Sequence, residues 1–176
     1  MASRILDDMK LYKGIDGLIR TYRKDYKCKS LNHGANELTL PNFDCEVLNQ
    51  CLCKFAHHYA CQLPEPETNG SIYLRINMFE DINTLALFPL GEATLSVIGS
   101  VVGPYYYGTR KSIKVRVETK RMKNFDGSLA YVKSSSNFAA AHVPEMVSLK
   151  MRYDTTLWLY NNLYITELTS GKFSWL

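Results

Sequence analysis

The sequence lacks the local signatures by which many enzymes are recognised. Its 176 residues hold no Gly-x-Ser-x-Gly elbow, which argues against a serine nucleophile of the hydrolase type. A complete phosphate-binding loop is missing too, since Thr169 to Lys172 match only the end of such a loop. The acidic residues that could act together as general acid and base are scattered through predicted turns. We therefore expect a protein without enzyme activity.

An unbroken apolar run is also missing. Between Ile82 and Thr109 the only formal charge is Glu92, but prolines and glycines interrupt this segment. A membrane-spanning helix needs about 20 mostly apolar residues, and these interruptions argue against one. We interpret the segment as two buried strands, at 84–88 and 94–102.

The N-terminal segment lacks the pattern of a secretory signal, because Asp7 and Asp8 precede any apolar run. The cysteines are odd in number and stand at positions 28, 45, 51, 53 and 61. An odd count without an export signal predicts reduced thiols in a cytosolic or nuclear setting, and a protein that is not secreted.

The apolar periodicity changes along the chain. In residues 1–63 apolar side chains recur at helical spacing, which predicts helices from Ser3, from Asp16 to about Cys28, and over 43–62. The segment 30–41 is expected to be a loop. Prolines and an Asn-Gly pair then mark a linker at 64–70.

Residues 71–176 follow the period of two that is typical of strands. We predict strands at 72–78, 113–117 and 147–152, a hairpin over 156–168, and a last strand at 173–176. No helix is expected among them. The fold class is therefore α+β, with N-terminal helices followed by a mostly antiparallel β-sandwich or partly open barrel.

The net charge of the chain resides in its first 30 residues, where eight basic and four acidic side chains account for the formal +4. On the predicted second helix, an apolar stripe beside basic residues is typical of a helix that lies on anionic lipid. This candidate membrane or assembly arm comprises Arg20, Arg23, Lys24 and Lys27. The alternative, which we favour, is a helix packed on the sheet with a solvated basic back.

A second basic cluster follows three consecutive tyrosines at 105–107. On a strand, Lys114 and Arg116 must project from the face opposite Ile113 and Val115. A basic ridge beside aromatic rings can hold phosphates and stack bases, so we consider nucleic-acid or anionic-surface binding. The alternative is the solvent face of an ordinary strand and a charged turn. The ridge comprises Arg110, Lys111, Lys114, Arg116, Lys120, Arg121 and Lys123.

A Cys/His cluster on the predicted helix 43–62 is the nearest approach to a metal site. Cys53, His57 and Cys61 are spaced by four residues and share one face. Zinc requires four tetrahedral ligands, however, and one helix cannot surround the metal alone. We therefore expect ordinary thiols, and no metal or cofactor.

The layout of a basic amphipathic N-terminal region before a compact β-rich body resembles the small matrix proteins of rhabdoviruses, particularly those of plant viruses. This resemblance implies a non-enzymatic viral structural protein that self-associates and bridges the nucleocapsid to a membrane. Its partners would be further copies of itself, the viral nucleocapsid or RNA, and an anionic membrane surface. Its location would be the host cytoplasm or nucleus and the virion.

Two other functions fit the same features. A jelly-roll-like viral capsid or movement protein would bind single-stranded nucleic acid through the basic ridge. An enzyme built on a β scaffold is the third interpretation, and it depends on the Cys/His cluster alone.

Overall fold

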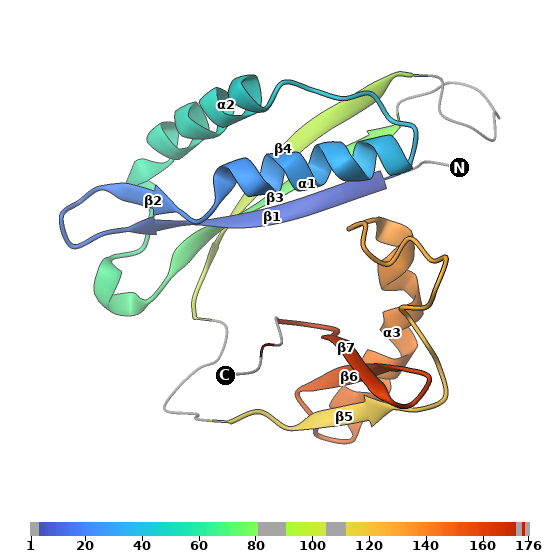
Figure 1. The fold of residues 1–176 in the computed structure, drawn as a ribbon. Coiled ribbons are helices and arrows are strands. Elements are labelled where there is room, and N and C mark those ends of the chain that lie inside the picture. Colours follow the sequence, from blue (N-terminus) through green and yellow to red (C-terminus); the bar gives the residue numbers. More distant parts are fainter. Residues whose placement is uncertain (1–3, 81–90, 105–111, 172–173, 175–176) are drawn as a thin grey trace. The chain divides into compact units, whose positions relative to one another are not determined.

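The computed structural model describes residues 4–80, 91–104, 112–171 and 174. The chain divides into two compact units, unit 1 (Met1–Tyr107) and unit 2 (Gly108–Leu176), each with its own sheet (Figure 1). This division differs from the predicted one, in which a linker at 64–70 separates helices from strands. The segment 64–70 instead forms the short 3-10 helix η2 (Pro66–Thr68) and the turn into the next strand, all inside unit 1.

Unit 1 contains a four-stranded antiparallel sheet in the order β2-β1-β3-β4. Its strands are β1 (Arg4–Lys13), β2 (Ile19–Thr21), β3 (Ser71–Glu80) and β4 (Ala93–Val102). The strands predicted at 72–78 and 94–102 are thereby confirmed, but the expectation that 94–102 is buried is wrong, because β4 has no buried residue and exposes Ile98 and Val101. The strand predicted at 84–88 lies outside the described residues.

The helix predicted from Ser3 is wrong, because the described part of that segment is β1. Ile5, Met9 and Leu11 are buried on one face of the strand, and the buried Asp7 occupies the position between them. An acidic residue in the buried row concealed the period of two. Its carboxylate is 2.8 Å from the ammonium of Lys27, which compensates its charge.

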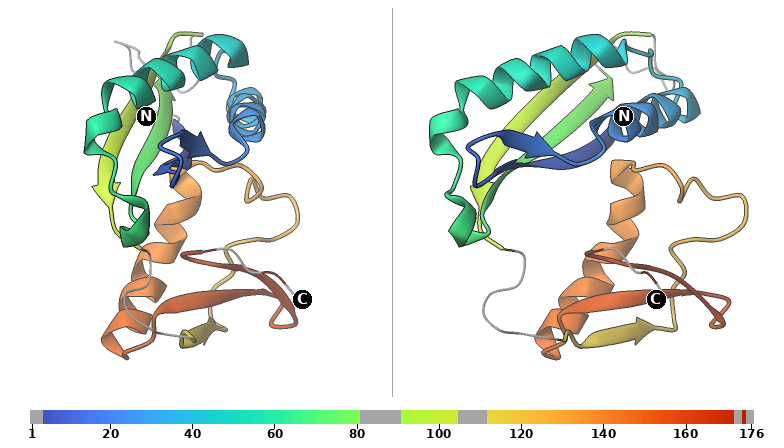
Figure 2. Two further views of the ribbon diagram at one scale, coloured as in Figure 1. Left: turned by 90° about the vertical axis from the view of Figure 1, so that its left-hand side faces the viewer. Right: turned by 60° about the vertical axis from the view of Figure 1, so that its left-hand side comes forward.

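Two helices, α1 (Lys24–Glu37) and α2 (Cys45–His58), cover one face of this sheet (Figure 2). The Lys27–Asp7 ion pair joins α1 to β1. On the same face, a Cβ added to Gly99 of β4 would lie 2.8 Å from Cζ of Phe55 in α2. Only glycine permits this close approach of helix and strand.

The three helix predictions for the N-terminal part therefore have different outcomes. The helix over 43–62 is confirmed as α2 with the short 3-10 helix η1 (Ala60–Gln62), and the side chain of Asp44 caps it by accepting from the N–H of Glu46. The helix over 16–28 is wrong, since this segment contains a turn, β2 and only the start of α1. The loop predicted at 30–41 is helical as far as Glu37, because Leu31 and Ala35 are buried in the core.

The expectation of reduced thiols is wrong for two of the five cysteines. Cys28 of α1 and Cys45 at the start of α2 form a disulfide, with their Cα atoms 5.6 Å apart. The packing of α1 beside α2 brings together residues that are 17 apart in sequence. The other cysteines, at 51, 53 and 61, are free and exposed.

We expect that Cys45→Ala lowers the free energy of unfolding of unit 1 by about 3 kcal/mol, since the disulfide restricts the unfolded chain. Thermal melts in the presence and absence of a reducing agent measure the same effect on the unchanged chain. Cys51→Ala is the control and should alter stability by less than about 0.5 kcal/mol. Equal melting temperatures with and without reductant would contradict the prediction.

Unit 2 contains a three-stranded sheet in the order β5-β6-β7. β5 (Val115–Glu118) runs parallel to β6 (Thr155–Tyr160), and α3 (Ser135–Lys150) lies between them in the chain. β6 and β7 (Tyr164–Leu168) form the predicted hairpin, which is confirmed. Its turn contains Asn161 and Asn162 at φ angles of 50° and 54°, a conformation that asparagine tolerates well.

The α+β class is confirmed, but a single sandwich or barrel is wrong because the strands form two separate sheets. The strand predicted at 147–152 is largely the end of α3, where the apolar Val147 and Leu149 are exposed, as is Met151 directly after the helix. The buried residues of α3 are Ala141, Pro144 and Ser148, a small and partly polar set with little apolar contrast. The last predicted strand, at 173–176, lies almost wholly outside the described residues. Among the helices that the structure describes, none is long and apolar enough to cross a membrane.

Candidate functional site

The loop after β5 carries several charged side chains at one edge of the sheet of unit 2. When parallel strands are joined through a helix, ligands bind at the carboxyl ends of those strands. The loop 119–134 begins at this edge of the sheet and leads directly into α3. It contains Lys123, Asp126 and Lys133.

Asn137 in the first turn of α3 holds the end of this loop in place. Its side-chain N–H groups donate to the carbonyl oxygens of Leu129 and Val132, at 2.6 and 2.7 Å. Val132 and Ser134 are buried, and the half-buried Lys133 lies between them. The backbone at Lys133 is therefore anchored on both sides.

A partly buried ion pair joins this loop to β7. The ammonium of Lys123 is 2.8 Å from Oε1 of Glu167 on β7, and the two side chains are only 7% and 34% exposed. The same ammonium lies 5.3 Å from the ring centroid of Phe138, in the first turn of α3. Lys123 therefore connects the loop to both β7 and α3.

Glu167 is supported by the centre of the sheet. Its cross-strand neighbour is Trp158, which is fully buried. The indole N–H of Trp158 donates to Oγ1 of Thr169, at 2.8 Å. The position of the Glu167 carboxylate therefore depends on the packing of this tryptophan.

Arg116 does not project into solvent, because the face of β5 that carries its side chain is covered by α3. Its guanidinium is directed toward α3, where it donates to Oγ of Ser148, and it also donates to Oε2 of Glu118, at 2.9 and 2.7 Å. Burial alone would raise the pKa of Glu118, but the hydrogen bonds from Arg116 and from the N–H of Lys120 give a net lowering. Arg116 and Glu118 are thus a structural pair under the helix.

The predicted basic ridge is not one continuous surface. Lys114, Lys120 and Arg121 are exposed, whereas Arg116 and Lys123 are held in ion pairs. Arg110 and Lys111 lie outside the described residues. Anion binding by the exposed residues of the ridge stays a prediction.

The four residues of the predicted membrane or assembly arm do not share one helix. Arg20 lies in β2 and forms an ion pair with Asp16, whose pKa is lowered to about 2 mainly by its hydrogen bond with Arg20. The guanidinium of Arg23 lies 4.4 Å from the ring centroid of Tyr26. Lys24 and Lys27 lie in the first turn of α1, and Lys27 pairs with Asp7.

The Cys/His cluster does not form a metal centre among the residues that the structure describes, where no group of three His, Cys, Asp or Glu side chains is placed to hold a metal ion. Cys53 and His57 are exposed on α2, and Cys61 follows in η1.

Sequence reasoning did not single out Lys133 or Glu167. The helical signal of α3 was missed, and with it the strand–helix–strand unit that identifies the loop 119–134 as a ligand-binding position. Recognition of that unit would have directed attention to the lysines of this loop.

No family model matches the sequence. Curated relatives are branched-chain-amino-acid aminotransferases. The protein of Dictyostelium discoideum is 30% identical over 171 residues, which cover 95% of this chain and 44% of that protein. The cytosolic protein of Saccharomyces cerevisiae is 29% identical, with the same two coverages, and transaminase 1 of Bacillus subtilis is 24% identical over 94% of this chain and 47% of that protein. The chain thus spans less than half the length of the curated relatives it matches.

Solved structures show the same fold. A branched-chain amino acid aminotransferase solved with pyridoxamine 5′-phosphate, from the organism abbreviated T.th., has a TM-score of 0.78 at 16% identity, over 95% of this chain and 53% of that chain. The corresponding Escherichia coli enzyme has a TM-score of 0.74 at 14% identity, over 95% and 52%.

These comparisons correct several sequence-based predictions. The matrix-protein resemblance is wrong, and so are the viral structural function and the expectation of a non-enzymatic protein, because the relatives are aminotransferases. The predicted nucleocapsid, RNA and membrane partners are wrong for the same reason, and the capsid or movement protein finds no support. Over 95% of its length, the chain is similar to somewhat less than half of a branched-chain-amino-acid aminotransferase and has the fold of the corresponding part of the solved enzymes.

Proposed function

We propose that this chain takes part in amino-group transfer from branched-chain amino acids with a pyridoxal phosphate cofactor, and that Lys133 is the residue that bonds to the cofactor. The observation that carries the proposal is the match of 95% of the chain to aminotransferases at up to 30% identity. One of the solved enzymes of the same fold is described with pyridoxamine 5′-phosphate.

The side chains around the loop 119–134 are of the types that such a cofactor requires. When bound, a pyridoxal cofactor supplies an aldehyde for a lysine amine and a ring that accepts electrons from the substrate carbon. An acidic side chain commonly holds the ring nitrogen in its protonated form. The half-buried lysines of this loop are Lys123 and Lys133, and β7 supplies the carboxylate of Glu167.

The two lysines have different positions. Lys123 is held by the ion pair with Glu167 and lies over the ring of Phe138, so we assign it to the support of that carboxylate. Lys133 is half-buried, and its buried neighbours fix its backbone directly before α3, in the loop where ligands of such a unit bind. We therefore assign the covalent role to Lys133.

Glu167 and Lys123 have a supporting role in this proposal. The carboxylate of Glu167 would receive the protonated ring nitrogen, and Lys123 would hold that carboxylate in position. The position of Glu167 along β7 is set by its cross-strand pairing with Trp158 and by the β6–β7 hairpin. Both supporting groups are thus positioned by unit 2 itself.

The proposal is tested by adding pyridoxal 5′-phosphate to the purified chain, reducing with borohydride, and determining the mass and the modified peptide. We expect one cofactor per chain, attached at Lys133. Pyridoxine 5′-phosphate, which lacks the aldehyde, is the control and should leave the mass unchanged. A scatter of substoichiometric adducts over the exposed lysines would contradict the proposal.

Substrate class is tested in the same assay. Leucine added before borohydride is expected to decrease the adduct, since amino-group transfer leaves no aldehyde to be trapped. Lysine and aspartate, as poor matches to a branched-chain specificity, should decrease it less. An equal effect of all three amino acids would contradict the branched-chain assignment.

A further inference from the structure

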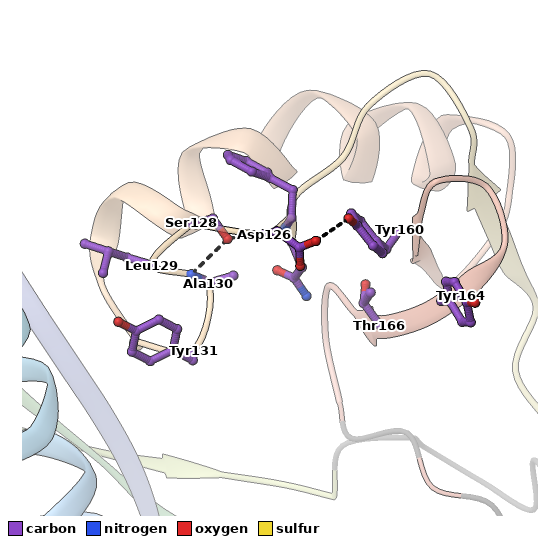
Figure 3. A pocket seen from close by; sticks show the side chains of 11 residues that line it. Asp126, Ser128, Leu129, Ala130, Tyr131, Tyr160, Tyr164 and Thr166 are labelled. Atoms are coloured by element: carbon purple, nitrogen blue, oxygen red, sulfur yellow. Dashed lines mark hydrogen bonds between the residues drawn. The ribbon is translucent and has the colours of Figure 1, made fainter.

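A second feature of unit 2 lies on the other face of β7. Side chains alternate between the two faces of a strand, so Thr166 projects away from the side on which Glu167 meets Lys123. Thr166 lines a hollow of about 620 Å³, bounded by the loop residues 124–131 and by the β6–β7 hairpin (Figure 3). The ion pair of the proposed cofactor site is not part of this hollow.

The hollow carries negative charge and no compensating cation. Of the eleven residues that line it, all of which the structure describes, Asp126 is the only one with a charge at neutral pH. Oδ2 of Asp126 accepts from the hydroxyl of Tyr160 at 2.7 Å, and Figure 3 shows these two side chains directed toward each other. Accepting this bond leaves the carboxylate charged and still able to accept more.

Aromatic rings form much of the remaining wall. The rings of Tyr160 and Tyr164 are stacked, with centroids 6.4 Å apart and planes inclined by 28°. Tyr131 lines the hollow from the loop, and both Tyr131 and Tyr164 are about 60% exposed. The faces of such rings carry partial negative charge and attract cations.

We propose that this hollow binds an alkylammonium group, either a small amine or the side chain of a lysine in a peptide. An ammonium donates to the Asp126 carboxylate, and its alkyl stem can pack against the tyrosine rings. An anion is disfavoured by Asp126, and a neutral apolar ligand leaves the charge of Asp126 uncompensated. The charge, the hydrogen-bonding capacity and the aromatic wall of the hollow thus all favour an alkylammonium ligand.

The experiment uses the full chain with butylammonium as probe, and 1-butanol and butyrate as neutral and anionic probes of the same length. NMR of tyrosine ring protons follows the titration up to about 10 mM, since one ion pair with a few ring contacts gives a millimolar dissociation constant. We expect saturable shifts of Tyr160 and Tyr164 with butylammonium alone. Equal shifts with butanol, or the absence of saturation with butylammonium, would overturn the proposal.

Two variants locate the site. Asp126→Asn removes the charge but retains an acceptor for Tyr160, and we expect it to weaken binding about tenfold. Tyr164→Leu removes one ring and is expected to weaken binding about threefold, which keeps the test decisive should the first variant fold poorly. Glu67→Gln removes an exposed acid of unit 1 and is the matched control, expected to bind as the parent chain does. Unchanged binding in both hollow variants would overturn the proposal.

A short peptide with one central lysine distinguishes the two sources of the ammonium. If a peptide lysine is the ligand, the peptide binds at least tenfold more tightly than butylammonium, because its backbone adds contacts. If a small amine is the ligand, the two bind alike. Either result supports an alkylammonium site, whereas binding of neither overturns it.

Discussion

Replacement of Lys133 by methionine is expected to abolish the borohydride-stable adduct with pyridoxal 5′-phosphate. Methionine has a similar length and no amine, so the covalent bond cannot form whatever the affinity for the cofactor. Lys133→Arg retains the positive charge and is expected to lose the adduct as completely, since a guanidinium stays protonated. Mass spectrometry of the intact chain and of its peptides measures both variants.

Two further lysine variants make this result specific. Lys120→Met removes an exposed lysine of the same loop and is expected to retain the full adduct. Lys123→Met is expected to retain the covalent bond but to weaken cofactor binding, because Glu167 loses the ammonium 2.8 Å from its carboxylate. Loss of the adduct in Lys123→Met, with retention in Lys133→Met, would assign the covalent role to Lys123 instead.

Trp158→Ala is expected to lower the free energy of unfolding of unit 2 by about 3–5 kcal/mol, the usual cost of deleting a large buried aromatic side chain. Trp158 is fully buried, its strand lies between β5 and β7, and it faces both Glu118 and Glu167 across the sheet. Its removal leaves a cavity at the centre and the hydroxyl of Thr169 without its donor. Urea unfolding followed by circular dichroism measures the change.

A conservative change at the same position separates volume from hydrogen bonding. Trp158→Phe retains most of the buried volume and loses only the indole N–H, so we expect a smaller loss of about 1–2 kcal/mol. Because Glu167 is the cross-strand neighbour, Trp158→Ala should also decrease trapping of the cofactor in the chains that remain folded. An alanine variant as stable as the parent chain would show that the centre of this sheet is not the core of unit 2.

The predictions that held concern elements whose pattern is local. β3 shows a buried apolar row, α2 has a capping aspartate at its start, and the β6–β7 hairpin has an asparagine turn. In each of these elements, the residues that determine its secondary structure lie within it or directly beside it. Propensity, capping and turn chemistry then agree with the tertiary structure.

The predictions that failed concern elements whose buried residues are polar or small. β1 has Asp7 in its buried row, and α3 buries Ala141, Pro144 and Ser148 while it exposes Val147 and Leu149. Apolar periodicity cannot identify a face of this kind. Arg116 was likewise expected in solvent, because the sequence of its strand does not indicate that α3 covers it.

The sequence by itself determined the α+β class, the position of α2 and the hairpin, and the concentration of basic residues in the first 30, because these depend on composition and short-range pattern. Only the tertiary structure decided that Cys28 meets Cys45, that Lys123 pairs with Glu167, and that Asp126 meets Tyr160. Each of these contacts joins residues from different elements, from 17 to 44 positions apart. The intervening chain must fold before each pair of residues can meet. The free energy that orders these contacts comes from tertiary packing, which a local sequence pattern does not encode.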